Sequence, residues 1–236
     1  MPKAKKTLEP QQERSRESLR KLLKAAAEVL GQHGVEGTTI PRIAHHAGLT
    51  PGAVYRRFRD KDELLETAIL GILERQDERL KEWTTPAMAA KIPLEVFAEQ
   101  IVGGMLVSYR ANAALLRALR QFTQGRAHTS FVKKATKLEV RSYERLVELI
   151  LANRKDIRHP DPRMAISLGL MMVISTLYEL VVMPSSVKDW RGLLPNDDQA
   201  LKHELTRAFL SYLEVESKPR APAGITETGR TSRRRV

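Results

Sequence analysis

The hydrophobic residues of this chain recur mostly at intervals of three and four positions, which is the period of an amphipathic α-helix. The first such stripe covers residues 15–31, and Gly34 and Gly37 follow it. Further helices are predicted over residues 61–83, 94–109, 112–124, 130–151, 163–183 and about 197–216. The pattern therefore predicts an all-α protein.

Residues 38–61 predict two short helices joined by a tight turn. Thr38 or Thr39 is a suitable N-cap for the first helix, because a hydroxyl oxygen can accept a free backbone N–H. Gly48 is a suitable terminator, since glycine adopts the left-handed conformation that often ends a helix. Thr50 and Pro51 repeat the start signal for the second helix.

The second of these helices has one apolar face and one basic face. Val54 and Phe58 lie four residues apart and are expected to face the core. The opposite face carries Gly52, Ala53, Tyr55, Arg56, Arg57 and Arg59. A face that is small at its first turn and then aromatic and basic is typical of a recognition helix in the major groove of DNA. Residues 39–58 are therefore predicted to form a helix-turn-helix motif.

The charge distribution supports a polyanionic partner at the N-terminal end. The chain of 236 residues has a formal charge of +12. Residues 1–61 contribute +7, residues 218–236 contribute +5, and residues 62–217 are neutral in sum. Such an asymmetry favours nucleic-acid binding over general solubility as the role of the charge.

The two terminal segments are expected to be disordered. Residues 1–14 form a polar, basic arm, and residues 218–236 form a tail rich in Pro, Gly, Thr and Arg. Their cations either add affinity for the DNA backbone or are solvated without a role. The N-terminal residues contain no apolar run that resembles a secretory signal, so the expected compartment is the cytoplasm.

Residues 15–76 resemble the DNA-binding domain of the TetR family of bacterial transcriptional regulators. The resemblance rests on the blocks TTIPRIAHHAG and LTPGAVYRRF and on Lys61 followed by Leu64 and Leu65. It implies that residues 77–217 form a helical domain that binds a small effector and dimerises. It also implies that the partner is an operator in double-stranded DNA.

The resemblance and the motif together assign roles in DNA binding. Contacts to DNA are expected from Thr38, Thr39, Arg42, Thr50, Pro51, Gly52, Ala53, Tyr55, Arg56, Arg57 and Lys61. The threonines, Tyr55 and Lys61 are expected at phosphates, and residues 51–53 at base edges. Arg56 is the candidate for a specific base contact, whereas Arg57 is expected at the backbone. Arg59 is more readily explained as a solvated charge, and the role of Arg42 stays open.

The second domain offers candidates for an effector pocket and a dimer interface. The pocket candidates are Met105, Tyr109, Phe122, Tyr143, Met171, Met172 and Tyr178, although methionines and aromatic residues at this spacing are also ordinary core residues. Because few charged residues are expected to be buried there, an apolar effector is favoured. The family resemblance implies dimerisation through the last two helices, and Leu201, Leu205, Ala208, Phe209 and Tyr212 form the apolar side of the final one.

Catalysis and membrane insertion are not favoured. The six histidines are scattered without metal-ligand spacing, and the chain has no cysteine. Neither a phosphate-binding glycine loop nor a Gly-x-Ser-x-Gly motif is present, so no catalytic residue, metal or cofactor is expected. Residues 163–183 are apolar enough to suggest a membrane span, but Ser167, Thr176 and Glu179 and the flanking prolines favour a buried helix.

The sequence thus predicts a homodimeric repressor that binds a palindromic operator and is released by a small ligand. The alternative is a structural protein that coats DNA non-specifically and has no effector. A third possibility, a ligand-binding protein with a vestigial DNA motif, is disfavoured because residues 50–58 are intact.

Overall fold

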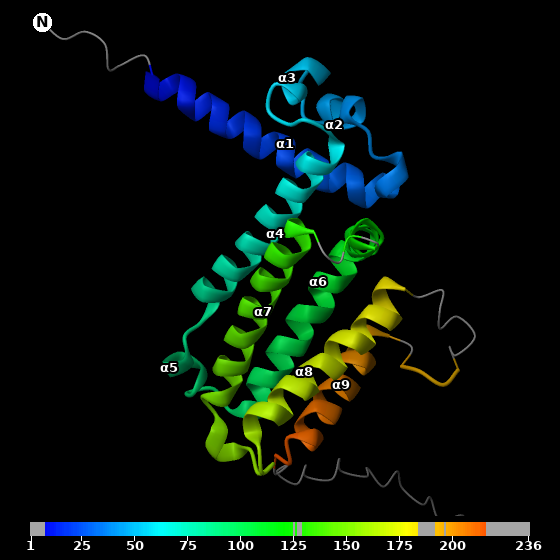
Figure 1. Cartoon of the computed structure of the whole chain (residues 1–236). Helices are drawn as coiled ribbons and strands as arrows, with labels where there is room; N and C mark the ends of the chain where they lie inside the picture. Colours follow the sequence, from blue (N-terminus) through cyan, green and yellow to red (C-terminus); the bar gives the residue numbers. More distant parts are fainter. Residues whose placement is uncertain (1–7, 125, 127–128, 184–191, 196, 216–236) are drawn as a thin grey trace, which may run out of the picture.

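The computed structural model describes residues 8–124, 126, 129–183, 192–195 and 197–215. These residues form helices and, within these ranges, no strand. The elements are α1 (Leu8–Gly37), α2 (Ile40–His46), α3 (Pro51–Tyr55), α4 (Lys61–Trp83), α5 (Pro86–Ala89), α6 (Leu94–Thr123), α7 (Ser130–Leu151), the 3₁₀ turn η1 (Arg154–Asp156), α8 (Pro162–Leu177), the π-helical turn η2 (Tyr178–Val182) and α9 (Asp198–Tyr212). Helices α1–α3 lie at one end of the molecule and α8 and α9 toward the other, and α4 leads from the first group toward the second (Figure 1).

Helix α1 begins earlier than the hydrophobic pattern predicts. It starts at Leu8, so the prediction of an irregular arm is wrong for residues 8–14, whereas residues 1–7 lie outside the described part of the chain. Pro10 falls in the first turn, where its missing N–H costs nothing, and good helix formers follow it. Gly34 interrupts the helix near its end with φ 66° and ψ −175°.

The caps of the helix-turn-helix motif agree with the sequence prediction. Thr39 caps α2 by accepting a hydrogen bond from the Arg42 N–H at 3.3 Å. Thr50 caps α3 by accepting one from the Ala53 N–H, also at 3.3 Å. Gly48 has φ 67°, in the left-handed region that the turn between the helices requires.

The core of the DNA-binding unit is completed by the second half of the chain. Each of the helices α1–α4 contributes a completely buried side chain to this core, namely Leu22, Ile43, Val54 and Leu64. The same cluster also contains side chains of α6 and α7, namely Ala118, Phe122, Phe131 and Ala135. The sequence prediction placed a domain boundary between residues 76 and 77, yet the core of the DNA-binding unit includes side chains from both sides of this boundary.

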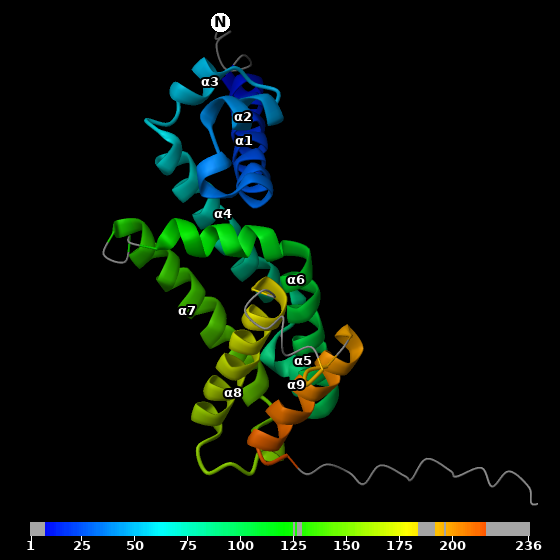
Figure 2. The ribbon, with the colours of Figure 1, turned by 90° about the vertical axis from the view of Figure 1, so that its right-hand side faces the viewer.

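Helix α6 is a single helix of 30 residues, not the two helices predicted over residues 94–109 and 112–124. The Asn112 side chain was expected to cap a new helix. Instead, it donates a hydrogen bond to the Ser108 carbonyl one turn earlier, at 2.8 Å, so the helix continues. Figure 2 shows that α6 bends along its length, and the end that leads into α7 lies beneath the DNA-binding unit.

A second hydrophobic core is formed by side chains of α5–α9 and η2, and α8 with η2 is its most apolar segment. Segment Pro162–Val182 is long and apolar enough to cross a membrane by length and composition. In the structure, 44% of its apolar 18-residue stretch is buried. Ala165, Ile166 and Leu170 are fully buried in the second core. A core helix meets the same criteria as a membrane span, and this packing explains the buried apolar residues of the segment.

Helix α9 packs closely against α8 because Gly169 has no side chain. A Cβ atom at Gly169 would lie 2.7 Å from the ring of Phe209, closer than van der Waals contact allows. Asp197 caps α9 by accepting a hydrogen bond from the Ala200 N–H at 2.8 Å, as the sequence predicts. The helix ends at Tyr212, before the predicted end at residue 216.

A buried carboxylate joins α4 to α7. The side chain of Asp77 on α4 is inaccessible to solvent. It lies 2.9 Å from Arg141 and 3.3 Å from Arg145 on α7, and 3.6 Å from Lys81. Burial opposes ionisation of this carboxyl group, but the hydrogen bond from Arg145 and the charges of Arg145, Arg141 and Lys81 outweigh it and lower the pKa of Asp77.

We expect Asp77→Asn to lower the free energy of unfolding by about 2 kcal/mol at pH 7, because the amide leaves the partly buried Arg145 and the more exposed Arg141 without their counter-charge. Glu78→Gln, at an exposed position in the same turn, is the matched control and should change stability little. Urea denaturation monitored by circular dichroism measures both.

The pH dependence of this difference follows from the lowered pKa. The stabilisation by Asp77 is fully present above the ordinary aspartate pKa of about 4 and is lost as the pH falls through the lower pKa of the folded state. Equal stability of wild type and Asp77→Asn at pH 7 would contradict the structural role of the ion pairs.

Candidate nucleic-acid interface

Helix α3 presents the surface that the sequence assigns to DNA. Val54 is completely buried and Phe58 is 7% exposed, so this side of the segment is fixed to the core. Pro51, Gly52 and Arg56 are exposed on the other side, and Tyr55 is 58% exposed although it is a large aromatic residue. The cap and the two core contacts therefore hold a short helix whose outer face is free of the protein.

The three arginines that follow Tyr55 differ in their contacts. Within the described residues, the Arg56 side chain has no hydrogen-bond or ion-pair partner, so its charge is available to a ligand. The Arg57 guanidinium donates to the carbonyl and the hydroxyl of Ser15 on α1, both at 3.1 Å. Arg59 lies 3.5 Å from Glu63, which partly neutralises it. Arg57 thus connects the end of α3 to α1, a role that sequence reasoning did not find because 42 positions separate the partners.

Two further cations bind backbone carbonyls at the end of α1. The Lys61 ammonium donates to the Val35 carbonyl at 3.1 Å, and Arg42 donates to the Gly37 carbonyl. Both carbonyls lie in the last residues of α1, after the interruption at Gly34. Lys61 and Arg42 therefore have an intramolecular role in this structure, beside any contact to phosphate.

Thr38 does not have the DNA-binding role that the sequence predicted for it. Its side chain is completely buried, and its hydroxyl donates to the Gly34 carbonyl at 2.5 Å. It therefore stabilises the chain reversal after α1 and cannot present its hydroxyl to a phosphate. Thr39 and Thr50 are exposed and remain candidates.

Arg126, which sequence reasoning missed, connects the loop between α6 and α7 to the start of α4. Its guanidinium donates to the Asp62 carboxylate at 2.6 Å and lies 3.9 Å from the centre of the Phe122 ring. Asp62 directly follows Lys61. Because 64 positions separate Arg126 from Asp62, no local pattern in the sequence could indicate this link.

The residues predicted to line an effector pocket do not gather in one place. Met171 and Met172 are 49% and 43% exposed on the surface of α8, so they do not line an interior cavity of this chain. Phe122 belongs to the core of the DNA-binding unit, where its ring meets Phe131 edge-on at 5.8 Å. Both assignments are wrong for the same reason, since helical periodicity does not say which neighbour a face will meet.

The other pocket candidates lie in or against the second core. Met105, Tyr109 and Tyr143 pack against it, and the Tyr143 hydroxyl donates to the Ser167 carbonyl. Burial raises the pKa of Tyr109, and the nearby charges of Tyr178 and Glu139 act in the same direction. The Tyr178 hydroxyl is buried without a hydrogen-bond partner among the described residues.

The residues predicted to form the dimer interface are mostly core residues of one chain. Leu201 and Phe209 are 5% and 2% exposed, and Leu205 is buried with them between α9 and its neighbours. They cannot contact a partner chain, because the apolar face of α9 packs on α6 and α8. Ala208 is exposed and Tyr212 is partly exposed, so these two remain candidates.

Comparisons with known proteins agree with this architecture. Residues 22–68 match the model of the bacterial regulatory proteins of the tetR family. The HTH-type transcriptional regulator BetI of Escherichia coli is 25% identical over 194 residues, which cover 81% of this chain and 91% of BetI.

Two solved structures have a similar fold. A TetR-family regulator from Mesorhizobium loti gives a TM-score of 0.64 at 18% identity, covering 85% of this chain and 97% of that one. FadR from Bacillus subtilis, solved in complex with stearoyl-CoA, gives a TM-score of 0.55 at 17% identity. The match covers 82% of this chain and 98% of FadR. Residues 22–68 therefore form a DNA-binding domain of the tetR family of bacterial regulatory proteins, and the all-α fold around it is similar to that of TetR-family regulators.

Proposed function

We propose that this protein acts in the cytoplasm as a homodimeric repressor, which binds a palindromic operator in double-stranded DNA and leaves it when a small effector binds. The observation that carries the proposal is the outer face of α3. Its base-edge candidates, residues 51–53, are exposed or partly exposed beside Tyr55 and an unpaired Arg56. A rigid helix with this surface suits direct reading of base edges in the major groove.

Dimerisation is supported by an exposed apolar face on α8. Met164 and Leu168 are 58% and 46% exposed, and Met171 and Met172 extend the same side of the helix. Four large apolar side chains exposed on one helix are typical of an interaction surface. We infer that this face, with Ala208 and Tyr212 of α9 at its border, forms the interface between two copies of the chain.

Two recognition helices are needed because one reads only half of a site. In the DNA-binding state they lie about 34–36 Å apart and enter successive major grooves on one side of the duplex. Effector binding favours a second state in which α4 has moved and this spacing is lost. An effector shifts the balance only by its differential affinity for the two states.

The effector proposed for the second domain is a small, apolar molecule. Its candidate contacts are Met105, Tyr109, Tyr143 and Tyr178, which come from α6, α7 and the junction of α8 with η2. The unpaired hydroxyl of Tyr178 would give such a ligand one polar contact. The complex of FadR with stearoyl-CoA supports the idea that this fold accommodates a ligand with a large apolar part.

Arg56→Ala is expected to relax specificity. Loss of a bidentate base contact removes about 1–3 kcal/mol of discrimination at one position in each half-site, while binding to random DNA falls little. Fluorescence anisotropy with a selected duplex and with its single-base variants measures this. Arg59→Ala is the matched control, because Arg59 is paired with Glu63 and should contribute less. An unchanged ranking of the variant duplexes would show that Arg56 is not a base contact.

Lys61→Ala tests the role of a phosphate contact. The substitution should weaken binding to all sequences alike and reduce the slope of log affinity against log salt by about 1. Because Lys61 also donates to the Val35 carbonyl, the thermal unfolding midpoint has to be recorded in parallel. A change in base preference, with the salt slope unaltered, would exclude the phosphate role.

Leu168→Glu is expected to prevent dimerisation, because it places a charge at the centre of the apolar face of α8. Val140→Glu is the matched control, since Val140 is 48% exposed on α7, outside this face. Sedimentation velocity at micromolar concentration should show a monomer for Leu168→Glu and a dimer for wild type and the control. A dimer in all three would place the interface elsewhere.

A non-specific coating protein remains the second candidate function, supported by the excess of +7 in residues 1–61. Such a protein would bind every duplex alike, and its affinity would fall steeply as salt increases. The palindrome preference of the repressor is therefore the property that separates the two.

A further inference from the structure

A cleft of about 350 Å³ lies where α4 ends and α6 begins, away from the effector residues discussed above. Its lining comes from the end of α4, from α5 with the turn that follows it, and from the first turns of α6. The lining residues are Trp83, Thr84, Met88, Lys91, Ile92, Phe97 and Gln100. The volume falls at the lower end of the range of small-molecule sites, about 300–1,000 Å³.

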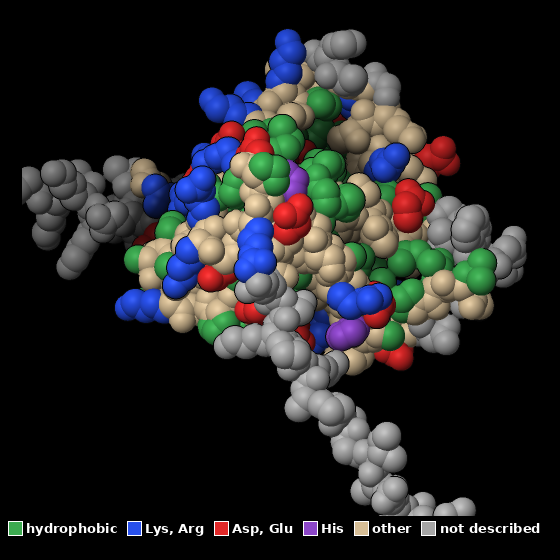
Figure 3. Space-filling model, turned by 90° about the horizontal axis from the view of Figure 1, so that it is seen from below, with side chains coloured by type: hydrophobic (Ala, Val, Ile, Leu, Met, Phe, Trp, Pro, Cys, Tyr) green, Lys and Arg blue, Asp and Glu red, His purple; other side chains and the backbone are tan. Residues whose placement is uncertain are grey.

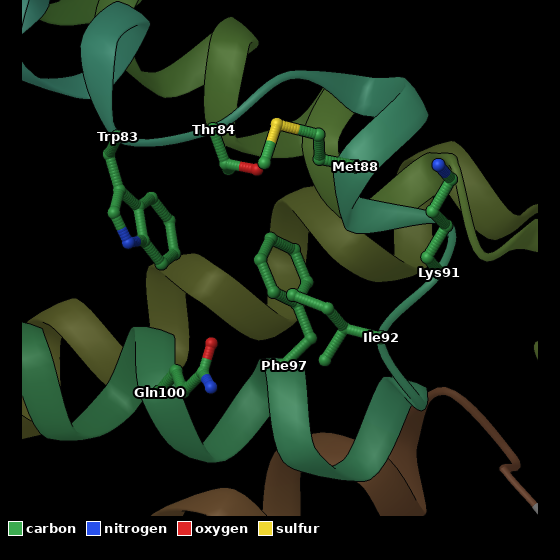
Figure 4. A pocket seen from close by; sticks show the side chains of 7 residues that line it. All are labelled: Trp83, Thr84, Met88, Lys91, Ile92, Phe97 and Gln100. Carbon is green, nitrogen blue, oxygen red and sulfur yellow. The ribbon is translucent and has the colours of Figure 1, made fainter.

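The floor and walls of the cleft are apolar and aromatic. The rings of Trp83 and Phe97 stack with centroids 5.5 Å apart and planes 10° from parallel. Phe97 is completely buried, whereas Trp83 and Met88 are 46% and 57% exposed. Figure 4 shows these side chains converging with Ile92 around one space. Large apolar side chains that stay exposed around a concave site are suited to an apolar ligand.

The backbone around the cleft is held in place. Thr85 caps α5 by accepting a hydrogen bond from the Met88 N–H at 3.3 Å. The buried side-chain amide of Asn153, which follows α7, donates to the Ala89 carbonyl at 3.2 Å. The turn that carries Lys91 and Ile92 is therefore preformed, and a ligand would not have to order it.

The polar groups of the cleft define the charge of its ligand. Lys91 is the only charged residue among the seven, and within the described residues it has no ion-pair partner. Gln100 and Thr84 add neutral polar groups, and Figure 4 shows Lys91 and Gln100 on opposite sides of the space. Seen from below, the surface of the molecule has basic and acidic side chains interspersed (Figure 3). A single carboxylate beside Lys91 suits this arrangement.

We propose that this cleft binds a small carboxylate with a compact apolar or aromatic body, and that its occupation weakens operator binding. The apolar body would lie on Trp83, Ile92 and Met88, and the carboxylate would pair with the Lys91 ammonium. Trp83 is the last residue of α4, whose first residue is Lys61 in the DNA-binding unit. A ligand that contacts α4, α5 and α6 together thus favours one position of α4. The effect on DNA rests on the proposed function, whereas binding to the cleft does not.

The binding test uses Trp83 as a reporter. The chain has two tryptophans, so Trp190→Phe leaves Trp83 as the only indole. Three probes with the same phenyl body differ in charge: 3-phenylpropionate, 3-phenylpropanamide and 3-phenylpropylamine. We expect saturable quenching of Trp83 that is tightest for the carboxylate and weakest for the amine. No saturable response to the carboxylate, or an equal response to all three probes, would overturn the proposal.

Substitutions identify the groups responsible. Lys91→Met should weaken carboxylate binding about fivefold, the value of an exposed ion pair of about 1 kcal/mol, and leave amide binding unchanged. Lys137→Met, at an exposed lysine of α7 outside the cleft, should change neither. Met88→Ala should weaken all three probes alike. Equal weakening of carboxylate and amide by Lys91→Met would remove the assigned ion pair, and circular dichroism shows whether each variant is folded.

The effect on DNA is measured separately, with the full chain and a selected operator. The carboxylate should lower operator affinity for wild type and have a reduced effect on Lys91→Met at the same concentration. Quenching of Trp83 with no change in operator affinity would overturn the coupling to α4. If the protein selects no operator although the carboxylate quenches Trp83, the proposed function fails and the ligand site stands.

Discussion

The attachment of α4 to α7 through Asp77 is the constraint on which the rest of the structure depends. Helix α4 begins in the core of the DNA-binding unit and ends at the cleft beside Trp83, so it belongs to both halves of the chain. A buried carboxylate between two arginines is costly to break and needs close geometry, and it therefore fixes the position of α4 on α7. Arg126 and the shared core around Phe122 and Phe131 add a second connection near the start of α4. Packed contacts and ion pairs therefore connect the helical domain to the DNA-binding unit.

Much of the DNA-binding unit could be predicted because its signals are local. Thr39, Gly48 and Thr50 act on backbone groups within a few residues, and their roles follow from the chemistry of helix ends. Val54 and Phe58 follow from a period of 3.6 residues. The matching model of the tetR family covers residues 22–68, the part of the chain in which these local signals are concentrated. The functional class could therefore be predicted, because it follows from the segment in which local sequence signals are strongest.

The rest could not be predicted because it depends on partners distant in sequence. The pattern showed an apolar stripe on α9, but whether Leu201 and Phe209 face the same chain or a second copy depends on how α6 and α8 pack. Met171 and Met172 are exposed and Phe122 is buried in the other unit, and their residue types did not distinguish these environments. Thr38 has the same residue type as its neighbour Thr39, yet the reversal at Gly34 buries only the first of the two. Thr84, Met88 and Lys91 line a cleft whose α5 segment is held by a hydrogen bond from the distant Asn153.

The most direct test of the central claim is selection of bound duplexes from a random pool at about 150 mM salt, where non-specific charge attraction is reduced. A dimeric repressor should enrich an inverted repeat whose half-sites lie about one helical turn apart, about 10–10.5 base pairs from centre to centre. Its positions in the genome would then indicate the regulated genes. Absence of any enriched sequence, with binding that disappears as salt rises, would contradict the account and favour a protein that coats DNA.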